Sequence, residues 1–402
     1  MAREVWITGI GLTSSLGEGL DAHWRAMAEA EHPAPVIDRT STPPYPLHPM
    51  VPLNLDLQIP RRADQRQMEP WQRIGTYTAG LALADAELTG KLDLLGHTHM
   101  VVAAGGGERD IAADSAILEG FKTAPAPDDF LNERLGNDLR PTLFLAQLPN
   151  LMAGNISIVH KVTGSSRTFM GEEIAGVSAI EIAGRRIRGD QGDIFLAGGC
   201  WLAGRKDLVL YSALGGKLWA GEPTSVWARP DKGGGAIMGS VACFLVLESR
   251  EHAEARGRKP YARLGPVLSD QSRRRPGQAT AKAARQFAEI EASLAGRPVA
   301  VISGASGVAE ATREEQAFLA GLIETGRVTT VRASANMLGS SVEASFPSMI
   351  GLAALALSRK RFYKPADTTG FETEAGMPDR ILVTSWGIWR GEGMGLVEAI
   401  EG

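Results

Sequence analysis

The chain has few of the side chains that enzymes use as nucleophiles or as acid–base groups near neutral pH. It contains two cysteines, Cys200 and Cys243, and seven histidines, the last of which is His252. Each cysteine lies in an apolar stretch, which is typical of a buried, reduced thiol; a disulfide between the two is the alternative. Because no histidine follows residue 252, acid–base chemistry in the C-terminal part of the chain would need other groups.

The elements that would position reactive groups alternate between strand and helix along the whole chain. Hydrophobic periodicity predicts strands at 5–12, 99–104, 167–170, 194–197, 242–247, 261–268, 299–303, 328–333 and 380–385, and helices at 20–30, 71–88, 151–159, 175–188, 281–294, 314–324 and 345–358. This alternation predicts an α/β protein with mixed sheets covered by helices, and its recurrence predicts a duplicated architecture. The Pro-rich segment 33–60 is expected to be an irregular surface excursion.

Composition and charge narrow the class of protein. The 402 residues allow one large domain or two fused domains. A net charge of −4 gives no case for nucleic acid or an anionic membrane as the main partner. The N-terminal residues do not read as a signal peptide, and no apolar run reaches membrane-spanning length. We therefore expect a cytoplasmic protein without membrane insertion.

Several segments resemble one family, the elongating β-ketoacyl-[acyl carrier protein] synthases. They are VWITGIGLTSSLG at 5–17, QRQME at 65–69, NLMAG at 150–154, DIFLAGG at 193–199 and LVLE at 245–248, the last followed by EHA at 251–253, RG at 256–257 and YA at 261–262. The segments keep the order and spacing of that family. The resemblance implies the thiolase-like five-layer αβαβα fold made of two similar halves, usually as a dimer. Residues 1–255 would form the half with the nucleophile elbow, and residues 256–402 the half with the family's two histidines.

The resemblance also locates the positions of the family's Cys-His-His triad, and none of the three residues is present. In the register fixed by 150–154 and 196–199, Glu173 stands at the position of the nucleophilic cysteine, and Gly176 retains the glycine that closes the nucleophile motif. Gly304 stands at the first histidine position and Ser340 at the second. Cys200 and Cys243 lie too far along the chain to replace the nucleophile.

Three roles are open for Glu173. A carboxylate at a helix N-terminus is favoured by the helix dipole and by free backbone N–H groups, so it could simply fill the anion-binding end of a disused site. It could instead bind or position a ligand. A role as catalytic base or nucleophile would lack the surrounding donors that make such a group useful.

The resemblance also implies partners and surrounding loops. Arg61, Arg62 and Arg66 match the family's docking region for acyl carrier protein, whose phosphopantetheine arm is the possible ligand; ordinary solvated arginines are the alternative. We expect no metal and no other cofactor. The gate loop carries Gly387, Ile388 and Trp389, so bulky residues stand where small ones normally let the loop move. Glu108 and Arg109 follow a triple glycine beside the expected acyl tunnel, so either that loop turns outward or the chain blocks its own tunnel.

Three functions follow from these expectations. The first is a non-catalytic partner of an active synthase, similar to the chain length factors, either in a heterodimer or as a homodimer. The second is an enzyme, either a malonyl-carrier-protein decarboxylase that relies on Ser340 and backbone amides or a residual 3-oxoacyl synthase. The third is a scaffold that binds carrier protein without controlling a tunnel.

Overall fold

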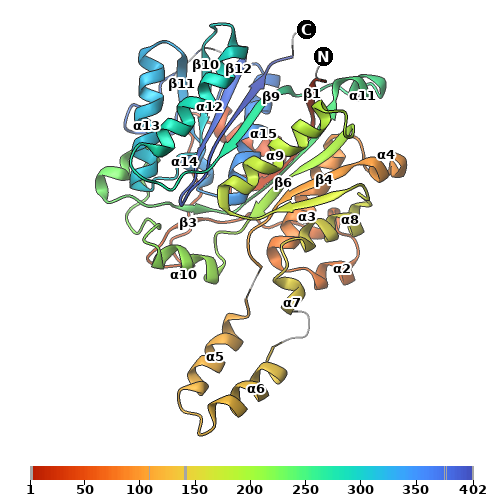
Figure 1. Ribbon diagram of the computed structural model, residues 1–402, viewed down its shortest axis with the longest axis vertical. Helices are drawn as coiled ribbons and strands as arrows, with labels where there is room; N and C mark the ends of the chain where they lie inside the picture. Colours follow the sequence, from red (N-terminus) through yellow and green to blue (C-terminus); the bar gives the residue numbers. More distant parts are fainter. Residues whose placement is uncertain (1–2, 108, 140–142, 375, 377, 401–402) are drawn as a thin grey trace.

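Two sheets of the same topology form the centre of the molecule (Figure 1). The computed structural model describes residues 3–107, 109–139, 143–374, 376 and 378–400. In the N-terminal half the strands run in the order β1-β8-β6-β4-β5. They are β1 Val5–Ser14, β4 His99–Ala103, β5 Ser166–Phe169, β6 Ile194–Trp201 and β8 Val241–Ser249. The pairs β1/β8 and β8/β6 are antiparallel, and the pairs β6/β4 and β4/β5 are parallel.

The C-terminal half repeats this arrangement strand for strand, in the order β9-β13-β12-β10-β11. Its strands are β9 Ala262–Asp270, β10 Val299–Ser303, β11 Val328–Ala333, β12 Arg380–Trp386 and β13 Glu392–Glu398. The first two pairs are again antiparallel and the last two parallel. A short antiparallel pairing of β1 with β9 joins the two sheets edge to edge. The predicted duplication is therefore confirmed.

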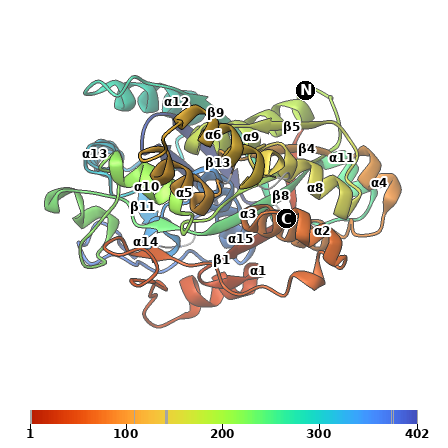
Figure 2. The same cartoon turned by 90° about the horizontal axis from the view of Figure 1, so that it is seen from below.

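Helices form the other three layers. The central layer holds α9 Glu172–Arg188 and α15 Ser345–Ser358, which pack in the core between the sheets. Nearly every residue of α15 is buried, as expected of a helix covered on all sides. Helices α3 Pro70–Asp85 and α8 Leu151–His160 cover one outer face, and α12 Gln278–Leu294 and α13 Ala309–Glu324 cover the other (Figures 1 and 2). This is the predicted five-layer thiolase-like fold.

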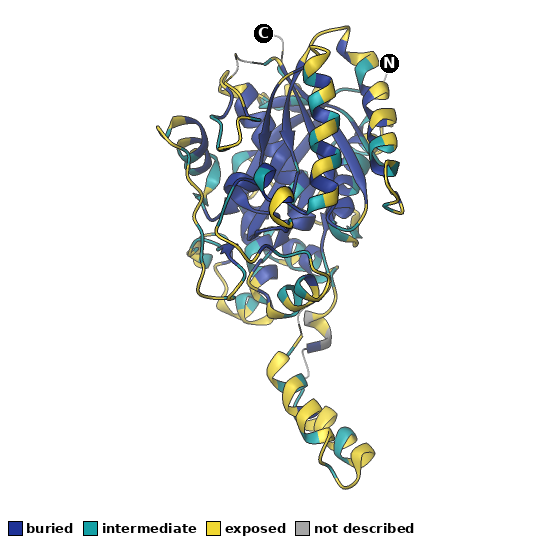
Figure 3. Cartoon of the chain, turned by 90° about the vertical axis from the view of Figure 1, so that its left-hand side faces the viewer, coloured by how far each residue is buried: buried dark blue, intermediate teal, exposed yellow. Residues whose placement is uncertain are grey.

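One part of the chain leaves the layered body. Helices α5 Ile111–Phe121 and α6 Pro127–Asn137 pack against each other and project below it as an arm (Figure 1). Figure 3 shows that the arm is mostly exposed, whereas the sheets are buried. Large apolar side chains are exposed on it, among them Leu118, Phe121 and Leu135. The hydrophobic pattern of this segment predicts no helix, so both helices were missed.

Short elements complete the chain. They are β2 Gly17–Glu18, α1 Gly19–Trp24, η1 Arg25–Glu29, β3 Leu47–His48, η2 Leu55–Leu57, α2 Arg62–Gln67, α4 Leu92–His97, α7 Leu143–Ala146, α10 Lys206–Leu214, η3 Val226–Ala228, η4 Pro230–Lys232, β7 Met238–Gly239, α11 Arg250–Ala255, α14 Ala335–Leu338 and η5 Val342–Ala344. In the described part of the chain, no helix is both long enough and apolar enough to cross a membrane.

Candidate functional site

A sharp turn between β5 and α9 places Glu173 in the first turn of a central helix. The turn uses Gly171 at φ 119° and Glu172 at φ 62°, both in the left-handed region. A glutamate in that region stores backbone strain, which is common at functional sites. Helix α9 begins at Glu172, three residues before the predicted start, because the turn leads directly into helical backbone. Gly176 allows close packing here, since a Cβ at this position would lie 2.5 Å from the backbone oxygen of Glu343.

Glu173 is buried without a cationic partner. Its side chain is only 6% exposed, and its Oε1 accepts a hydrogen bond from the backbone N–H of Ile388 at 3.0 Å. Its Oε2 lies against Gly387 and has no hydrogen-bond partner among the described residues. Burial raises the pKa of Glu173 to about 7; the Ile388 N–H opposes this shift, and the neighbouring charge of Glu172 adds to it. The carboxyl group is therefore partly protonated at neutral pH.

A second buried carboxyl group, which the sequence analysis did not identify, belongs to the same site. Glu343 in η5 is 3% exposed and lies against the triple-glycine loop, where a Cβ at Gly105 would be 2.7 Å from Glu343 Oε1. Burial raises the pKa of Glu343 to about 8, and the charges of Glu173 and Glu172 raise it further, while Arg205 lowers it. A glutamate inside an otherwise apolar and small-residue stretch was the signal available in the sequence.

The other two triad positions do not face Glu173 in the same cavity. Gly304 follows β10, and a Cβ there would lie 2.9 Å from the backbone oxygen of Thr384. The backbone of Ser340 forms a parallel β-bridge with Met238. Its hydroxyl is buried without a hydrogen-bond partner in the described part of the chain. The nearby His48 packs against Gly339, and burial lowers its pKa to about 3. Neither triad position carries an imidazole, and the buried His48 stays uncharged near neutral pH.

The two cysteines are free and buried, as predicted, and no disulfide joins them. Cys200 lies within β6 rather than after it, since the strand extends to Trp201. Its side chain packs in the outer core with α3 and α8, whereas Cys243 packs in the central core. Burial raises the pKa of both thiols, so neither is a ready nucleophile.

The gate loop closes over Glu173. Beyond the Ile388 contact, the backbone N–H of Gly387 donates to Gly391 O at 2.9 Å. Trp389 packs against Tyr211, with ring centroids 5.5 Å apart. Arg274 donates to Gly387 O at 2.6 Å and lies 3.5 Å from Glu392. The guanidinium of Arg274 therefore anchors this loop.

The predicted docking arginines lie apart from this site, at α2. Arg61, Arg62 and Arg66 are all exposed. The one ion pair that joins them to the described residues is between Arg61 and Asp64 at 4.0 Å. These side chains are thus free to contact a partner.

The loop after the triple glycine at 105–107 directs Arg109 outward. Glu108 lies outside the described residues, but Arg109 is 58% exposed and forms an ion pair with Asp114 at 2.7 Å. It lines a cavity of about 670 Å³ at the root of the arm. Arg205 fixes the loop by donating to Gly106 O at 3.0 Å and Gly107 O at 2.7 Å. The outward alternative is therefore the correct one for Arg109.

A cavity of about 260 Å³ opens beside the start of α9. Its wall combines carboxyl groups with aromatic rings. The carboxyl groups are those of Glu172, Glu173 and Glu343, and the rings are those of Trp201, Tyr211 and Trp389. The site can therefore accept hydrogen bonds and hold positive charge, but it has neither a thiolate nor imidazole donors.

Known proteins resemble this chain in sequence and in fold. The family model described as the β-ketoacyl synthase N-terminal domain matches residues 2–253. The 3-oxoacyl-[acyl-carrier-protein] synthase 2 of Rhizobium meliloti is 27% identical over 280 residues, which cover 65% of this chain and 63% of that protein. The match thus spans less than two thirds of that relative.

Two solved structures share the fold over the whole chain. The ishigamide ketosynthase/chain length factor superposes with a TM-score of 0.76 at 20% identity, covering 100% of both chains. A chain of AntDE:AntF, a type II polyketide synthase acyl-carrier protein in complex with its ketosynthase, superposes with a TM-score of 0.70 at 18% identity, again covering 100% of both chains.

Proposed function

Because the chain belongs to the β-ketoacyl synthase family, we propose that it is a non-condensing, chain-length-factor-like partner of an active β-ketoacyl-[acyl carrier protein] synthase in fatty acid or polyketide biosynthesis. The observation that carries the proposal is the elbow itself. Glu173 occupies the start of α9, with Glu343 buried in the same cavity wall. A scaffold that is kept while its reactive groups are replaced is consistent with a role in shaping or binding.

The replaced groups oppose both condensation and decarboxylation. Condensation needs a thiolate, which the site lacks. Decarboxylation of a malonyl group needs donors aimed at the developing enolate oxygen. The donors on the cavity wall are the indole and hydroxyl groups of Trp201, Tyr211, Ser212 and Trp389 rather than the family's two imidazoles, and an ionised malonyl carboxylate would also meet Glu173 and Glu343. Ser340, the one hydroxyl at a triad position, does not line this cavity.

A free sheet edge supports a partner chain. Strand β5 is the edge of its sheet and pairs only with β4 in the described structure. The carbonyls of Ser165 and Phe169 accept from β4, so by alternation the backbone N–H of Thr168 points to the open edge. Exposed edges of this kind pair readily with another chain. Met170, which follows the strand, is 61% exposed.

The test is co-expression with an intact β-ketoacyl synthase from the same genome, followed by size exclusion and native mass spectrometry. We expect a one-to-one heterodimer. Thr168→Pro removes the outward N–H without touching the β4 pairing and should abolish the heterodimer, whereas Thr168→Val retains the N–H and should keep it. A homodimer that is indifferent to the synthase would overturn the proposal.

Carrier-protein docking is the second part of the proposal. The exposed arginines of α2 would attract the acidic carrier protein and bring its phosphopantetheine arm to the assembly. The double reversal Arg62→Glu/Arg66→Glu should weaken carrier-protein binding and its salt dependence. Arg185→Glu, on another exposed arginine in α9, is the matched control. Equal binding by both variants would exclude α2 as the docking surface.

A further inference from the structure

The cavity beside α9 has polar atoms that the chain itself does not pair. Within the described residues, Oε2 of Glu172, Glu173 and Glu343 and the indole Nε1 of Trp201 are buried without a hydrogen-bond partner. All four residues line the cavity. Glu173 and Glu343 are more than nine-tenths buried, and Trp201 is 9% exposed. Buried polar atoms of this kind are costly unless a ligand or ordered water pairs with them.

The neighbouring cations are committed to other groups. Arg205 is held by the glycine loop and by Asp207 at 2.7 Å. Arg274 is held by Gly387 O and Glu392. Lys217 lies over the ring of Trp389, with its Nζ 4.9 Å from the centroid. The charge of Arg390 acts on Glu172. No ion pair of the described structure reaches Glu173 or Glu343, so a cation paired directly with these two carboxyl groups would come from outside the chain.

The shape and lining of the cavity favour a small organic cation over a metal ion. No group of three or more His, Cys, Asp or Glu side chains in the described structure is arranged to hold a metal. The rings of Trp389 and Tyr211 at the rim offer apolar area to the carbon chain of an organic cation. A volume of about 260 Å³ suits a ligand smaller than a drug. The rim is open, since Met170 is 61% and Tyr211 58% exposed.

We propose that this cavity binds the protonated amino group of a short primary alkylamine. An ammonium group offers three donors and no acceptor, which matches the unpaired oxygens of Glu173 and Glu343. The alkyl part would lie against the aromatic rim. Amine binding needs neither a partner synthase nor a carrier protein, so its test is independent of the test of the proposed function.

Binding must be linked to protons. The carboxyl groups hold a cation only when ionised, and their pKa values are about 7 for Glu173 and about 8 for Glu343. Affinity for an amine therefore rises as the pH increases from 6 to 8.5. Below pH 8.5, binding also releases protons from these two carboxyl groups. The charge of Arg274 lowers the pKa of Glu173 only in part, and that of Arg205 does the same for Glu343, while Arg390 and Arg274 act on the neighbouring Glu172.

The experiment uses n-butylamine as the probe and n-butanol as its neutral isostere. Calorimetric titration of the isolated chain, in two buffers of different ionisation enthalpy, should show butylamine binding with proton release and no butanol binding at the same concentration. Glu173→Gln/Glu343→Gln should weaken butylamine binding about 30-fold or more. The matched control is Glu254→Gln, on an exposed glutamate of α11.

Equal binding of butylamine and butanol, or pH-independent butylamine binding, would overturn the proposal and leave ordered water as the partner of these oxygens. If the double variant does not fold, the pH profile and the proton release of the wild-type chain decide the question. An indole N–H resonance of Trp201 that shifts with butylamine but not with butanol would place the ligand in this cavity.

Discussion

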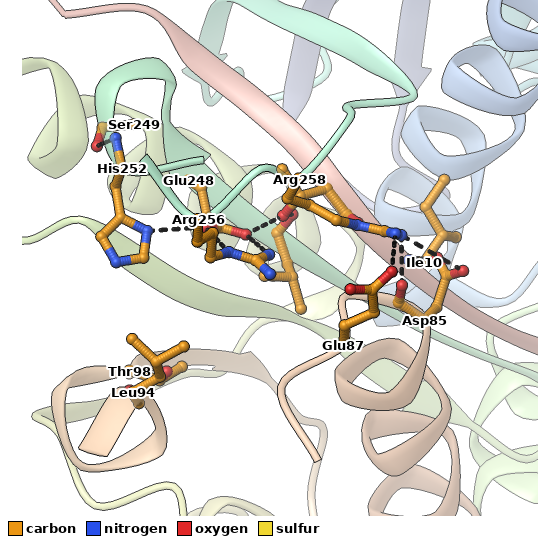
Figure 4. A network of polar contacts seen from close by, with 12 residues as sticks. Ile10, Asp85, Glu87, Leu94, Thr98, Glu248, Ser249, His252, Arg256 and Arg258 are labelled. Carbon is orange, nitrogen blue, oxygen red and sulfur yellow. Dashed lines mark hydrogen bonds and ion pairs between the residues drawn. The ribbon is translucent and has the colours of Figure 1, made fainter. Parts of the chain in front are cut away.

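Two buried carboxyl sites of this molecule follow opposite designs. Glu248 is fully buried, and it accepts hydrogen bonds from Arg256, from Thr8 and from His252 Nδ1 at 2.9 Å. Figure 4 shows Arg256 and His252 pointing toward it, with Arg258 held nearby by Asp85 and Glu87. Burial would raise the pKa of Glu248, but these hydrogen bonds outweigh it and lower the pKa to about 2.

The cavity beside α9 has the same residue type and the reverse outcome. Glu173 and Glu343 are as deeply buried, yet no cation is paired with them in the described structure, and their pKa values rise to about 7 and about 8. Pairing, rather than burial, therefore separates a structural carboxylate from a group held ready for a ligand. The Glu248 network joins β8 to β1 and α11 and needs nothing more; the Glu173 site is incomplete without an external donor.

Breaking the paired site should have the largest effect. Glu248→Gln leaves the guanidinium of Arg256, which is 11% exposed, without its counter-charge. We expect a loss of about 3–5 kcal/mol in the free energy of unfolding, measured by urea denaturation at pH 7.

Glu254→Gln is the control for that change, because it removes an exposed carboxylate that pairs with Arg250 on the same helix. Its effect should stay within about 0.5 kcal/mol. A Glu248→Gln chain as stable as this control would mean that the buried network contributes little, and the contrast between the two sites would lose its basis.

The unpaired site should respond in the opposite direction. The ordinary pKa of a glutamate is 4.5, and burial raises that of folded Glu343 to about 8. Between these values the folded chain binds more protons than the unfolded chain, so stability falls as the pH rises, by up to ~1.4 kcal/mol for each unit of pKa difference. Glu343→Gln should match the wild type near pH 5 and be more stable by a few kcal/mol near pH 9.

Urea titrations across this pH range measure the effect. Glu248 supplies the internal contrast, since a lowered pKa gives stability that is present above pH 4.5 and lost as the pH falls toward 2. If the free energy of unfolding changes with pH in the same way in Glu343→Gln and in the wild type, Glu343 is ionised at neutral pH and paired after all.

Much of the fold could be predicted from the sequence, because the body is built from long, strongly periodic segments. Strand β11 Val328–Ala333 and helix α15 Ser345–Ser358 have the predicted boundaries. Strand β13 was missed, because Gly393 and Gly395 interrupt its apolar pattern. The arm was missed because helices α5 and α6 bury only each other's faces and carry no stripe that a sheet would cover.

The site was predictable only where it depends on chain order. The sequence located Glu173 at the start of a helix and showed that no histidine lies in the C-terminal half. It could not show that Glu343, separated from Glu173 by 170 residues, lines the same cavity, because only the packing of η5 against α9 brings them together. The sequence likewise could not show that Arg274 binds the gate loop, because no local pattern specifies how that loop folds.

The smallest expected effect concerns a thiol placed at the elbow. In Glu173→Cys the start of α9 favours a thiolate, as helix N-termini do, but the charge of Glu343 opposes it. We expect Glu173→Cys/Glu343→Gln to react with iodoacetamide about tenfold faster at pH 7.5 than Glu173→Cys alone, corresponding to a pKa lower by about one unit. The wild-type chain supplies the background, since Cys200 and Cys243 are buried.

The rate of alkylation, followed by mass spectrometry across the full pH range, separates an effect of charge from an effect of access. A shifted midpoint of the rate profile reports the charge of Glu343. A changed maximum rate with the same midpoint would show that Glu343 acts by filling space alone. In the first case the carboxyl groups around the cavity themselves keep this elbow unsuited to the family's thiolate chemistry, so that restoring the sulfur would not be enough to restore the nucleophile.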